Sequence, residues 1–362
     1  MSNIASVAAE PTTIRKSPWS AGRALPEWLV VLGALVLALV VTGGLLQVVH
    51  PFIRHDDWAC TLGRHEPGSS GQFARNLYEG RWLNTVYWYV VGQRTSIVVA
   101  SMVFVVSYSA FVWGFVRALA PPSRLSTFVL TFAVFVSAIW VRLIYWPGTL
   151  SASMIVAAVA VVVAYRVGIL VVYAFNWLAF GTFGLTISAW RRPNPLESLE
   201  DLTENLARYG TQFTSLLGVL GWAAVAAVIS LVRALVDSST RRAAVIVLGA
   251  VIVVVALEGG LTVYSGVVAG ARASLWAWPA VCLPAALLLK GIRPSRIAGV
   301  VALAVIASVG TLTRRTDLGA HQQTRDQYDV IVNDTAAVVG QHPEDEVVMW
   351  LEPRWTAMAQ AP

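Results

Sequence analysis

Residues 28–49 read WLVVLGALVLALVVTGGLLQVV, a stretch without a single charged side chain. At 1.5 Å per residue, a helix needs about 20 apolar residues to cross the hydrocarbon core of a bilayer. The stretch is long enough for that, and no small-residue cleavage site closes it as in a secretory signal. We therefore interpret it as the first membrane span, preceded by a short cytoplasmic tail over residues 1–27.

Similar charge-free windows recur as far as residue 313. They cover residues 28–49, 95–116, 125–141, 143–165, 167–190, 209–232, 243–257, 273–289 and 297–313. Because a backbone in lipid must satisfy its own hydrogen bonds, such windows predict helices. We expect an all-α, polytopic membrane protein of about nine spanning helices over residues 28–313. Eight or ten spans stay open, because the fourth and fifth windows meet at Arg166 and the seventh is short.

The composition agrees with a chain that lies largely in lipid. Only 13% of the 362 residues are charged, 57% are hydrophobic, and the mean hydropathy is +0.65. A soluble domain carries about a quarter charged residues. The net charge is +6, but the basic residues lie mostly between windows, where they orient a membrane protein and contact anionic head groups. We therefore expect membrane lipids as partners and no nucleic acid.

Arginine and lysine in the short connections predict the orientation. With the N-terminus in the cytoplasm, the inner connections contain Arg117, Arg124, Arg166, Arg233, Arg241, Arg242, Lys290, Arg293 and Arg296. The outer connections then are residues 50–94, 146–151, 191–208 and 258–272, followed by a polar outward-facing tail over residues 314–362. Arg191 and Arg192 depart from the pattern, although four acids follow them closely.

Two outer connections have the pattern of helices that lie in the membrane surface, residues 70–89 and the segment after Asn194. Asn194-Pro195 predicts an N-cap and a first helical turn. A leucine stripe at helical spacing follows, with acids on the other face; its members are Leu196, Leu199, Leu202 and Leu206. In the tail, residues 326–339 are predicted to be helical and residues 346–351 have strand character.

The first outer connection begins HPFIRHDDWAC over residues 50–60 and contains the acidic pair Asp56-Asp57. Carboxylates at the bilayer surface are partly desolvated, and a neighbouring like charge raises one pKa further, toward the range useful for proton abstraction. His55 beside them can pair with an anion or tune the carboxylates. For an isolated Asp-Asp pair, a solvated turn that ends the helix is the alternative interpretation.

The residues that follow give the acidic pair more weight. The chain continues EGRWLN over residues 79–84 and then has an aromatic run at residues 87–89. An acidic pair just outside the first span, then Gly-Arg-Trp, then the next span resembles the GT-C superfamily of membrane glycosyltransferases. The O-antigen-modifying glucosyltransferases of the phage-conversion type are most similar, followed by the arabinosyltransferases of actinobacteria. The resemblance covers the first two spans and their loop, and elsewhere rests on span number and the outward tail.

The resemblance implies a polyprenyl-phosphate-linked sugar donor, a cell-envelope glycan acceptor and an active site on the outer face of the bacterial inner (plasma) membrane. Asp56 or Asp57 would be the general base on the acceptor hydroxyl, and the other would position the acceptor or a divalent cation. Arg81 would bind the donor phosphate, whose oxygens match a planar guanidinium. Trp58 and Trp82 would stack on sugar faces or anchor the chain at the interface.

Further candidates lie at other outer ends. Arg142 and Tyr145 end the third window, where an ionisable residue is a functional hypothesis by default, although Arg142 can equally reach the head groups. Glu258 and Arg272 bracket an apolar stretch that we expect to be re-entrant and to line the groove of the lipid carrier. Arg314-Arg315 begins the tail, in position for a phosphate or for lipid alone.

His321 and His342 do not have the spacing of metal ligands, and the two cysteines, Cys60 and Cys282, do not make a disulfide framework. Because a single carboxylate pair is in view, we expect direct displacement with inversion at the anomeric carbon. The alternative function is a transporter or flippase for a lipid-linked sugar, which typically has acids or broken helices near mid-membrane. The windows predict uninterrupted spans with charges at their ends, which favours the enzyme. A structural subunit of an envelope assembly is a third possibility. The sugar and the acceptor stay open.

Overall fold

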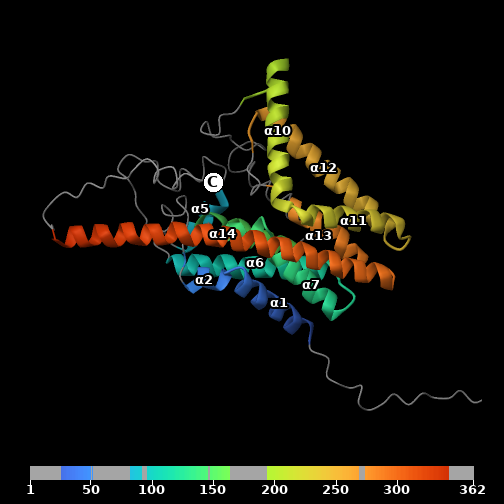
Figure 1. The fold of residues 1–362 in the computed structure, drawn as a ribbon, viewed down its shortest axis with the longest axis horizontal. Helices are drawn as coiled ribbons and strands as arrows, with labels where there is room; N and C mark the ends of the chain where they lie inside the picture. The colour runs from blue at the N-terminus through green and yellow to red at the C-terminus, as the bar shows by residue number, and fades with distance from the viewer. Residues whose placement is uncertain are drawn as a thin grey trace, which may run out of the picture.

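The computed structural model describes residues 26–49, 51, 82–91, 96–145, 147–163, 194–268 and 274–341. Within these ranges every regular element is a helix, which confirms the expected all-α fold (Figure 1). The elements are α1 (Glu27–Val41), α2 (Gly44–Val49), α5 (Trp82–Val91), α6 (Ile97–Leu119), α7 (Arg124–Phe135), the 3-10 helix η2 (Trp140–Tyr145), α8 (Pro147–Val163), α10 (Leu199–Leu220), α11 (Trp222–Val236), α12 (Arg241–Ser265), α13 (Ala277–Leu288) and α14 (Arg293–Gln341).

Several of these helices are suited to cross a membrane. By length and composition, three described helices qualify, namely α6, α12 and residues 293–320 of α14. The pair α10 and α11 is a fourth candidate, bent by 88° at its break. Four shorter apolar helices accompany them, Glu27–Val41, Arg124–Phe135, Leu150–Val159 and Ala277–Leu288. The described residues therefore belong to a membrane protein with three or four candidate spans, and the expected nine are not confirmed.

The helices are more interrupted than the charge-free windows predict. The first window breaks into α1 and α2 at Gly43, whose φ of +69° lies in the left-handed region that favours glycine. The third window is α-helical only as far as Phe135. The sixth window breaks between α10 and α11 at Gly221, with a φ of +48°. The prediction of uninterrupted spans is wrong, because hydropathy does not reveal where a glycine backbone turns.

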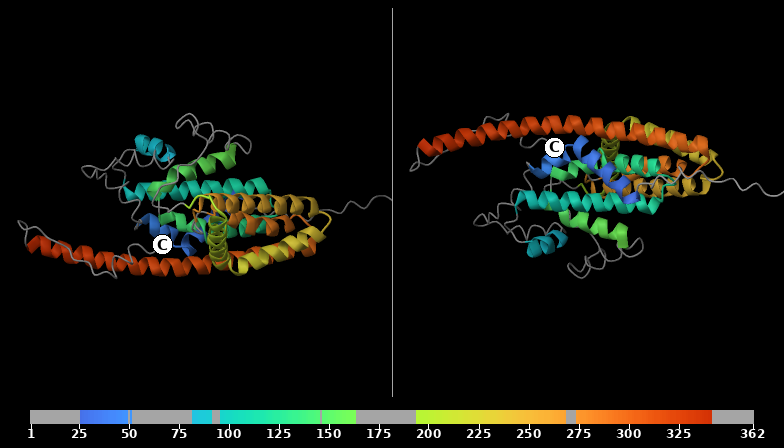
Figure 2. Two further views of the ribbon diagram at one scale, coloured as in Figure 1. Left: turned by 90° about the horizontal axis from the view of Figure 1, so that it is seen from above. Right: turned by 90° about the horizontal axis from the view of Figure 1, so that it is seen from below.

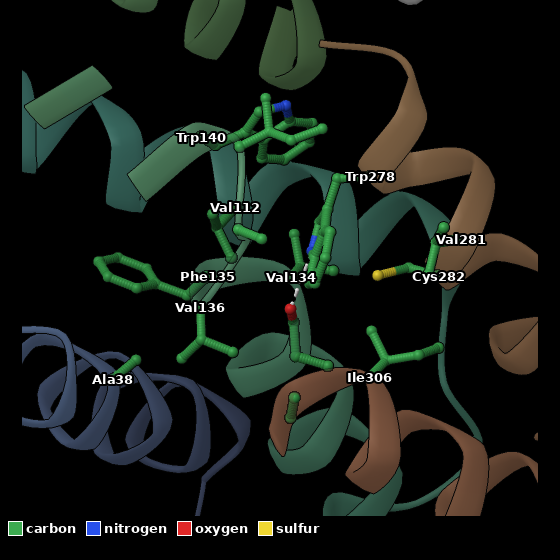
Figure 3. Close-up of a cluster of buried hydrophobic side chains, with 14 of the residues drawn as sticks. Ala38, Val112, Val134, Phe135, Val136, Trp140, Trp278, Val281, Cys282 and Ile306 are labelled. Atoms are coloured by element: carbon green, nitrogen blue, oxygen red, sulfur yellow. Dashed lines mark hydrogen bonds between the residues drawn. The ribbon is translucent and has the colours of Figure 1, made fainter. Parts of the chain in front are cut away.

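Side chains from distant helices stabilise the break after α7. Tyr108 Oη donates to the Phe135 carbonyl at 2.8 Å, and Trp278 Nε1 donates to the Ala133 carbonyl at 3.0 Å, the dashed line in Figure 3. Ser137 Oγ accepts from two backbone N–H groups at the approach to η2, at 3.2 and 2.9 Å. A buried carbonyl without a donor is costly in an apolar interior. These donors therefore allow the helix to end inside the protein.

The main core joins α1, α6, α7, α10, α11, α13 and α14. Figure 3 shows its centre, where side chains from several of these helices surround Trp278. A Cβ atom on Gly310 would collide with the Val136 carbonyl. The backbone of α14 therefore touches the end of α7 directly, and no side chain fits between them.

α10 begins at Leu199, four residues after the predicted start at Pro195, and it extends beyond the predicted leucine stripe, which ends at Leu206. Its N-cap is Ser198, which accepts from Asp201 N at 3.1 Å and donates to Asp201 Oδ2 at 2.7 Å. The prediction of an N-cap at Asn194 is wrong, because the helix begins only at Leu199 and Asn194 is instead joined to the end of α12, where its backbone N–H donates to the Ser265 carbonyl at 3.0 Å. α10 then continues to Leu220 through a stretch that the pattern divided between a surface helix and a span.

α14 is a single helix of 49 residues that runs along the bundle and extends beyond it (Figure 2). The predicted helix over residues 326–339 lies within it and is confirmed, whereas residues 346–351 lie outside the described residues. The helix passes residue 314, where we expect the tail to begin, without a break.

The basic turns gather at one end of the bundle. The start of α1 and the α6–α7, α11–α12 and α13–α14 turns lie there, while α5 and the C-terminal half of α14 lie toward the other end (Figures 1 and 2). Ser295 Oγ donates to Asp237 Oδ2 at 2.7 Å and joins the α11–α12 turn to the start of α14. The structure thus brings together Arg and Lys residues that the orientation scheme assigns to one side of the membrane.

Asp237 predicts a pH dependence of stability. Hydrogen bonds from Ser239 and Ser295 lower the pKa of its carboxyl group from 3.8 to about 2. Because the folded pKa is depressed, the contribution of the ionised group to stability is present above about pH 4 and is lost as the pH falls toward 2. We expect Asp237→Asn to lower the melting temperature in detergent near neutral pH, and the gap to the parent to close on acidification. A constant gap at all pH values would contradict this expectation, and Asp334→Asn, an exposed site on α14, is the control.

Candidate functional site

Much of the predicted site lies outside the described residues, namely His55, Asp56, Asp57, Trp58, Arg81 and Arg272. Trp82 is the first residue of α5, and Arg142 and Tyr145 lie in η2. The structure therefore describes α2 and α5, which precede and follow the acidic loop in sequence, and η2 and α14, which lie against α2 and the break before it. The proposed divalent cation at Asp56 and Asp57 stays a prediction.

α2, which leads into the acidic loop, packs side by side with η2. Gln47 of α2 is only 5% exposed, and its Nε2 donates to the Ile144 carbonyl of η2 at 3.5 Å. α2 ends at Val49, directly before the loop that contains Asp56 and Asp57. The chain thus enters the acidic loop beside the element that contains Arg142 and Tyr145, although the two are about 90 residues apart in sequence.

A buried arginine lies at the break between α1 and α2. Arg314 of α14 is 1% exposed, and its Nε donates to the Thr42 carbonyl at 3.0 Å. This carbonyl lies at the C-terminal end of α1, where the helix dipole favours a cation. A Cβ on Gly43 would lie 2.7 Å from a methyl carbon of Leu318, so the glycine lets α14 close against the break.

The neighbouring arginines Arg314 and Arg315, which the sequence pattern treats alike, differ in burial. Arg314 is buried and Arg315, its neighbour, is exposed. A charged side chain inside a membrane protein is expensive and usually serves a function or a fixed partner. Arg314 is therefore the member of the pair that belongs to the interior of the bundle.

α5 directs its polar and aromatic side chains into the protein. Asn84, Tyr87 and Trp88 are buried on one face of the helix, whereas Tyr89 and Val90 are 84% and 77% exposed. Tyr87 and Trp88 meet edge to face at 5.2 Å between ring centroids and pack with Ala152 of α8. α5 directly follows Gly80-Arg81, and its buried aromatic pair fixes it against α6 and α8.

A second polar cluster surrounds Glu258 in the candidate span α12. Its Oε1 accepts from Gln212 Nε2 at 3.0 Å and from Ser274 Oγ at 2.6 Å, and its Oε2 accepts from Trp276 Nε1 at 2.7 Å. The carboxylate therefore ties α12 to α10 and to the segment before α13. The sequence signal is an acid within an otherwise apolar stretch. The sequence pattern places Glu258 at the edge of an apolar stretch and does not predict that it joins three segments.

Glu258→Gln is expected to destabilise the protein by about 1.5–3 kcal/mol, because hydrogen bonds to a charged acceptor are lost and an amide N–H then faces another donor. Glu197→Gln, an exposed acid before α10, is the matched control and should change the free energy of unfolding by at most about 0.5 kcal/mol. Unfolding of both variants in detergent, followed by intrinsic tryptophan fluorescence, checks the prediction. Equal stability of the two variants would contradict it.

Among the described residues, no three His, Cys, Asp or Glu side chains gather as metal ligands. No protein-family model, no curated protein and no solved structure matches this chain. The fold and its long apolar helices define the class as an all-helical membrane protein.

Proposed function

We propose that this protein is a membrane glycosyltransferase of the GT-C type, which transfers a sugar from a polyprenyl-phosphate carrier to a cell-envelope glycan. The packing of α2 against η2 is the observation that supports the proposal most. The reaction needs a base for the acceptor and cations for the donor phosphate within one site. α2 leads to Asp56 and Asp57, and η2 contains Arg142, so their contact favours such a site.

The proposed setting is the bacterial inner membrane, with about nine spans, a cytoplasmic N-terminus and the acidic loop outside. The gathering of the basic turns at one end of the bundle supports this orientation, because arginine and lysine are enriched on the cytoplasmic side. α11 has 15 residues and so extends about 22 Å from the basic end, most of the way across a hydrocarbon core of about 30 Å. The 88° bend at that depth supports α10 as a helix lying near the outer surface.

The proposed reaction is a single displacement. The acceptor hydroxyl oxygen attacks the anomeric carbon while Asp56 or Asp57 takes its proton. The bond from that carbon to the phosphate oxygen breaks, and the polyprenyl phosphate leaves with the electron pair. Guanidinium groups stabilise the charge that develops on the phosphate, for which Arg81, Arg142 and Arg272 are the candidates. One displacement inverts the anomeric configuration.

A transporter or flippase for a lipid-linked sugar is the second candidate, and two observations favour it. The candidate span α10–α11 is interrupted at Gly221 and the first charge-free window at Gly43, and ionisable side chains lie inside the helical region at Arg314 and Glu258. Broken helices and buried charges are features of transporters that bind their substrate within the membrane.

One experiment separates the two functions. Purified protein receives a polyprenyl-phosphate sugar labelled in the sugar, together with envelope glycans, once in detergent and once in sealed vesicles. A glycosyltransferase labels a glycan and releases polyprenyl phosphate in both settings, because the reaction needs no sealed membrane. Movement of the intact carrier across sealed vesicles, without transfer in detergent, would contradict the proposed enzyme and support the flippase.

A further inference from the structure

Four helix ends meet at the basic end of the bundle. Small and apolar side chains from α11, α12, α13 and α14 pack together there in one buried cluster built on Ala234, Ala244 and Leu288, with Ala298 against it. The small residues let the helices approach closely. The cations of the two turns, α11–α12 and α13–α14, are therefore held around one small area of surface.

Arg233 lies near Asp237, and the other cations of this surface divide into two groups. Arg241 Nε donates to the Leu235 carbonyl at 2.9 Å, and Arg296 Nε donates to the Gly291 carbonyl at 2.8 Å. These two arginines therefore bind backbone carbonyls at the end of α11 and in the turn after α13. Arg242, Lys290 and Arg293 are exposed and, within the part of the chain that the structure describes, contact no acid or carbonyl. Their charge is available to a ligand.

Each of the two helices that begin here places a free cation and exposed apolar side chains on the same face. On α12, Arg242 is followed three and four residues later by Val245 and Ile246, which are 54% and 64% exposed. On α14, Arg293 is followed four residues later by Ile297, which is 58% exposed. The cation lies at the helix start in both cases, and the apolar side chains continue along the candidate span.

We propose that the starts of α12 and α14 bind the phosphate head group of an anionic phospholipid. Arg242, Lys290 and Arg293 contact the phosphate, and the acyl chains lie along Val245, Ile246 and Ile297. A soluble anion would use the cations alone, whereas a phospholipid also covers the apolar side chains next to them. Basic pockets between helices on the cytoplasmic side are known sites for anionic lipids. This site is independent of the proposed sugar transfer.

The hydrogen bond between Ser295 and Asp237 fixes the geometry of the site. Asp237 accepts from Ser295, and a Cβ on Gly291 would lie 2.9 Å from Asp237 Oδ2, so the α11–α12 and α13–α14 turns are in direct contact. Asp237 is the acid of these turns, and the hydrogen bonds from Ser239 and Ser295 together with the attraction of Arg233 keep it ionised. The cations of the two turns outnumber this negative charge, so the surface stays positive; they are Arg233, Arg241, Arg242, Lys290, Arg293 and Arg296.

The test measures lipid binding by the full-length protein. Native mass spectrometry of the purified protein, titrated with phosphatidylglycerol or phosphatidylcholine in detergent, gives the affinity for each lipid. Each cation that contacts the head group contributes about a five-fold preference for an anionic lipid, so Arg242→Gln/Arg293→Gln should weaken phosphatidylglycerol binding about 25-fold. Arg242→Lys/Arg293→Lys keeps the charge and should keep most of the binding.

The matched control is Arg117→Gln/Arg124→Gln, which removes the same charge from the α6–α7 turn at the same end of the bundle. It should leave phosphatidylglycerol binding within about two-fold of the parent. An equal loss in both double variants would overturn the proposal, since net charge alone would then explain binding. Equal affinity of the parent for both lipids, or displacement of the lipid by inorganic phosphate at similar concentration, would also overturn it.

Discussion

Asp56→Asn and Asp57→Asn are expected to slow sugar transfer, by about 10²–10⁴-fold for whichever residue is the general base. Asparagine keeps the size and polarity of the side chain but cannot accept the proton of the acceptor hydroxyl. The loss should fall on kcat, because the base acts in the transition state and not in binding of the donor. The other aspartate, if it positions the acceptor, should show a smaller loss that falls mainly on KM.

The measurement is the initial rate of label transfer from the polyprenyl-phosphate sugar, with donor and acceptor concentrations varied separately. Asp334→Asn, an exposed aspartate on the distal part of α14, is the control for charge and expression. Transfer at the parent rate by both Asp56→Asn and Asp57→Asn would remove the acidic pair from the mechanism. That result would not decide whether the protein is a glycosyltransferase. Failure of the parent to transfer sugar at all would contradict the proposed glycosyltransferase activity.

Gly310→Leu is expected to have the largest effect on stability, a loss of about 3 kcal/mol in the free energy of unfolding. The first added carbon would meet the Val136 carbonyl, and the next contact is the ring of Trp278 at 3.2 Å. The carbonyl belongs to the backbone and Trp278 is fully buried, so neither can move without disturbing the core. Unfolding in detergent and the yield of folded protein check the prediction.

Gly319→Leu in the same helix is the matched control. A Cβ on Gly319 would have nothing within 4 Å, and the residue is exposed. Because leucine is a better helix former than glycine, this variant should be as stable as the parent or up to about 1 kcal/mol more stable. If both variants have the same stability, α14 does not touch the end of α7 as described.

The sequence by itself predicts the class of fold. Runs without charge and their basic boundaries identify helices in a membrane protein. Both signals are properties of consecutive residues, so they can be read without knowing which helices pack together. The windows over residues 243–257 and 297–313 lie within α12 and α14, and residues 326–339 are helical as expected. The motif around Asp56 and Asp57 also comes from sequence alone, and its role stays a prediction.

Only the tertiary structure decides where those helices break and which polar residues lie inside. α7 ends at Phe135 because Tyr108 and Trp278, far from it in sequence, supply donors to its last carbonyls. Arg314 differs from Arg315 because it reaches the Thr42 carbonyl, 272 residues away. Glu258 became a junction because three donors converge on it from other segments. Each outcome depends on a hydrogen bond between distant parts of the chain, which a local pattern of hydropathy does not contain.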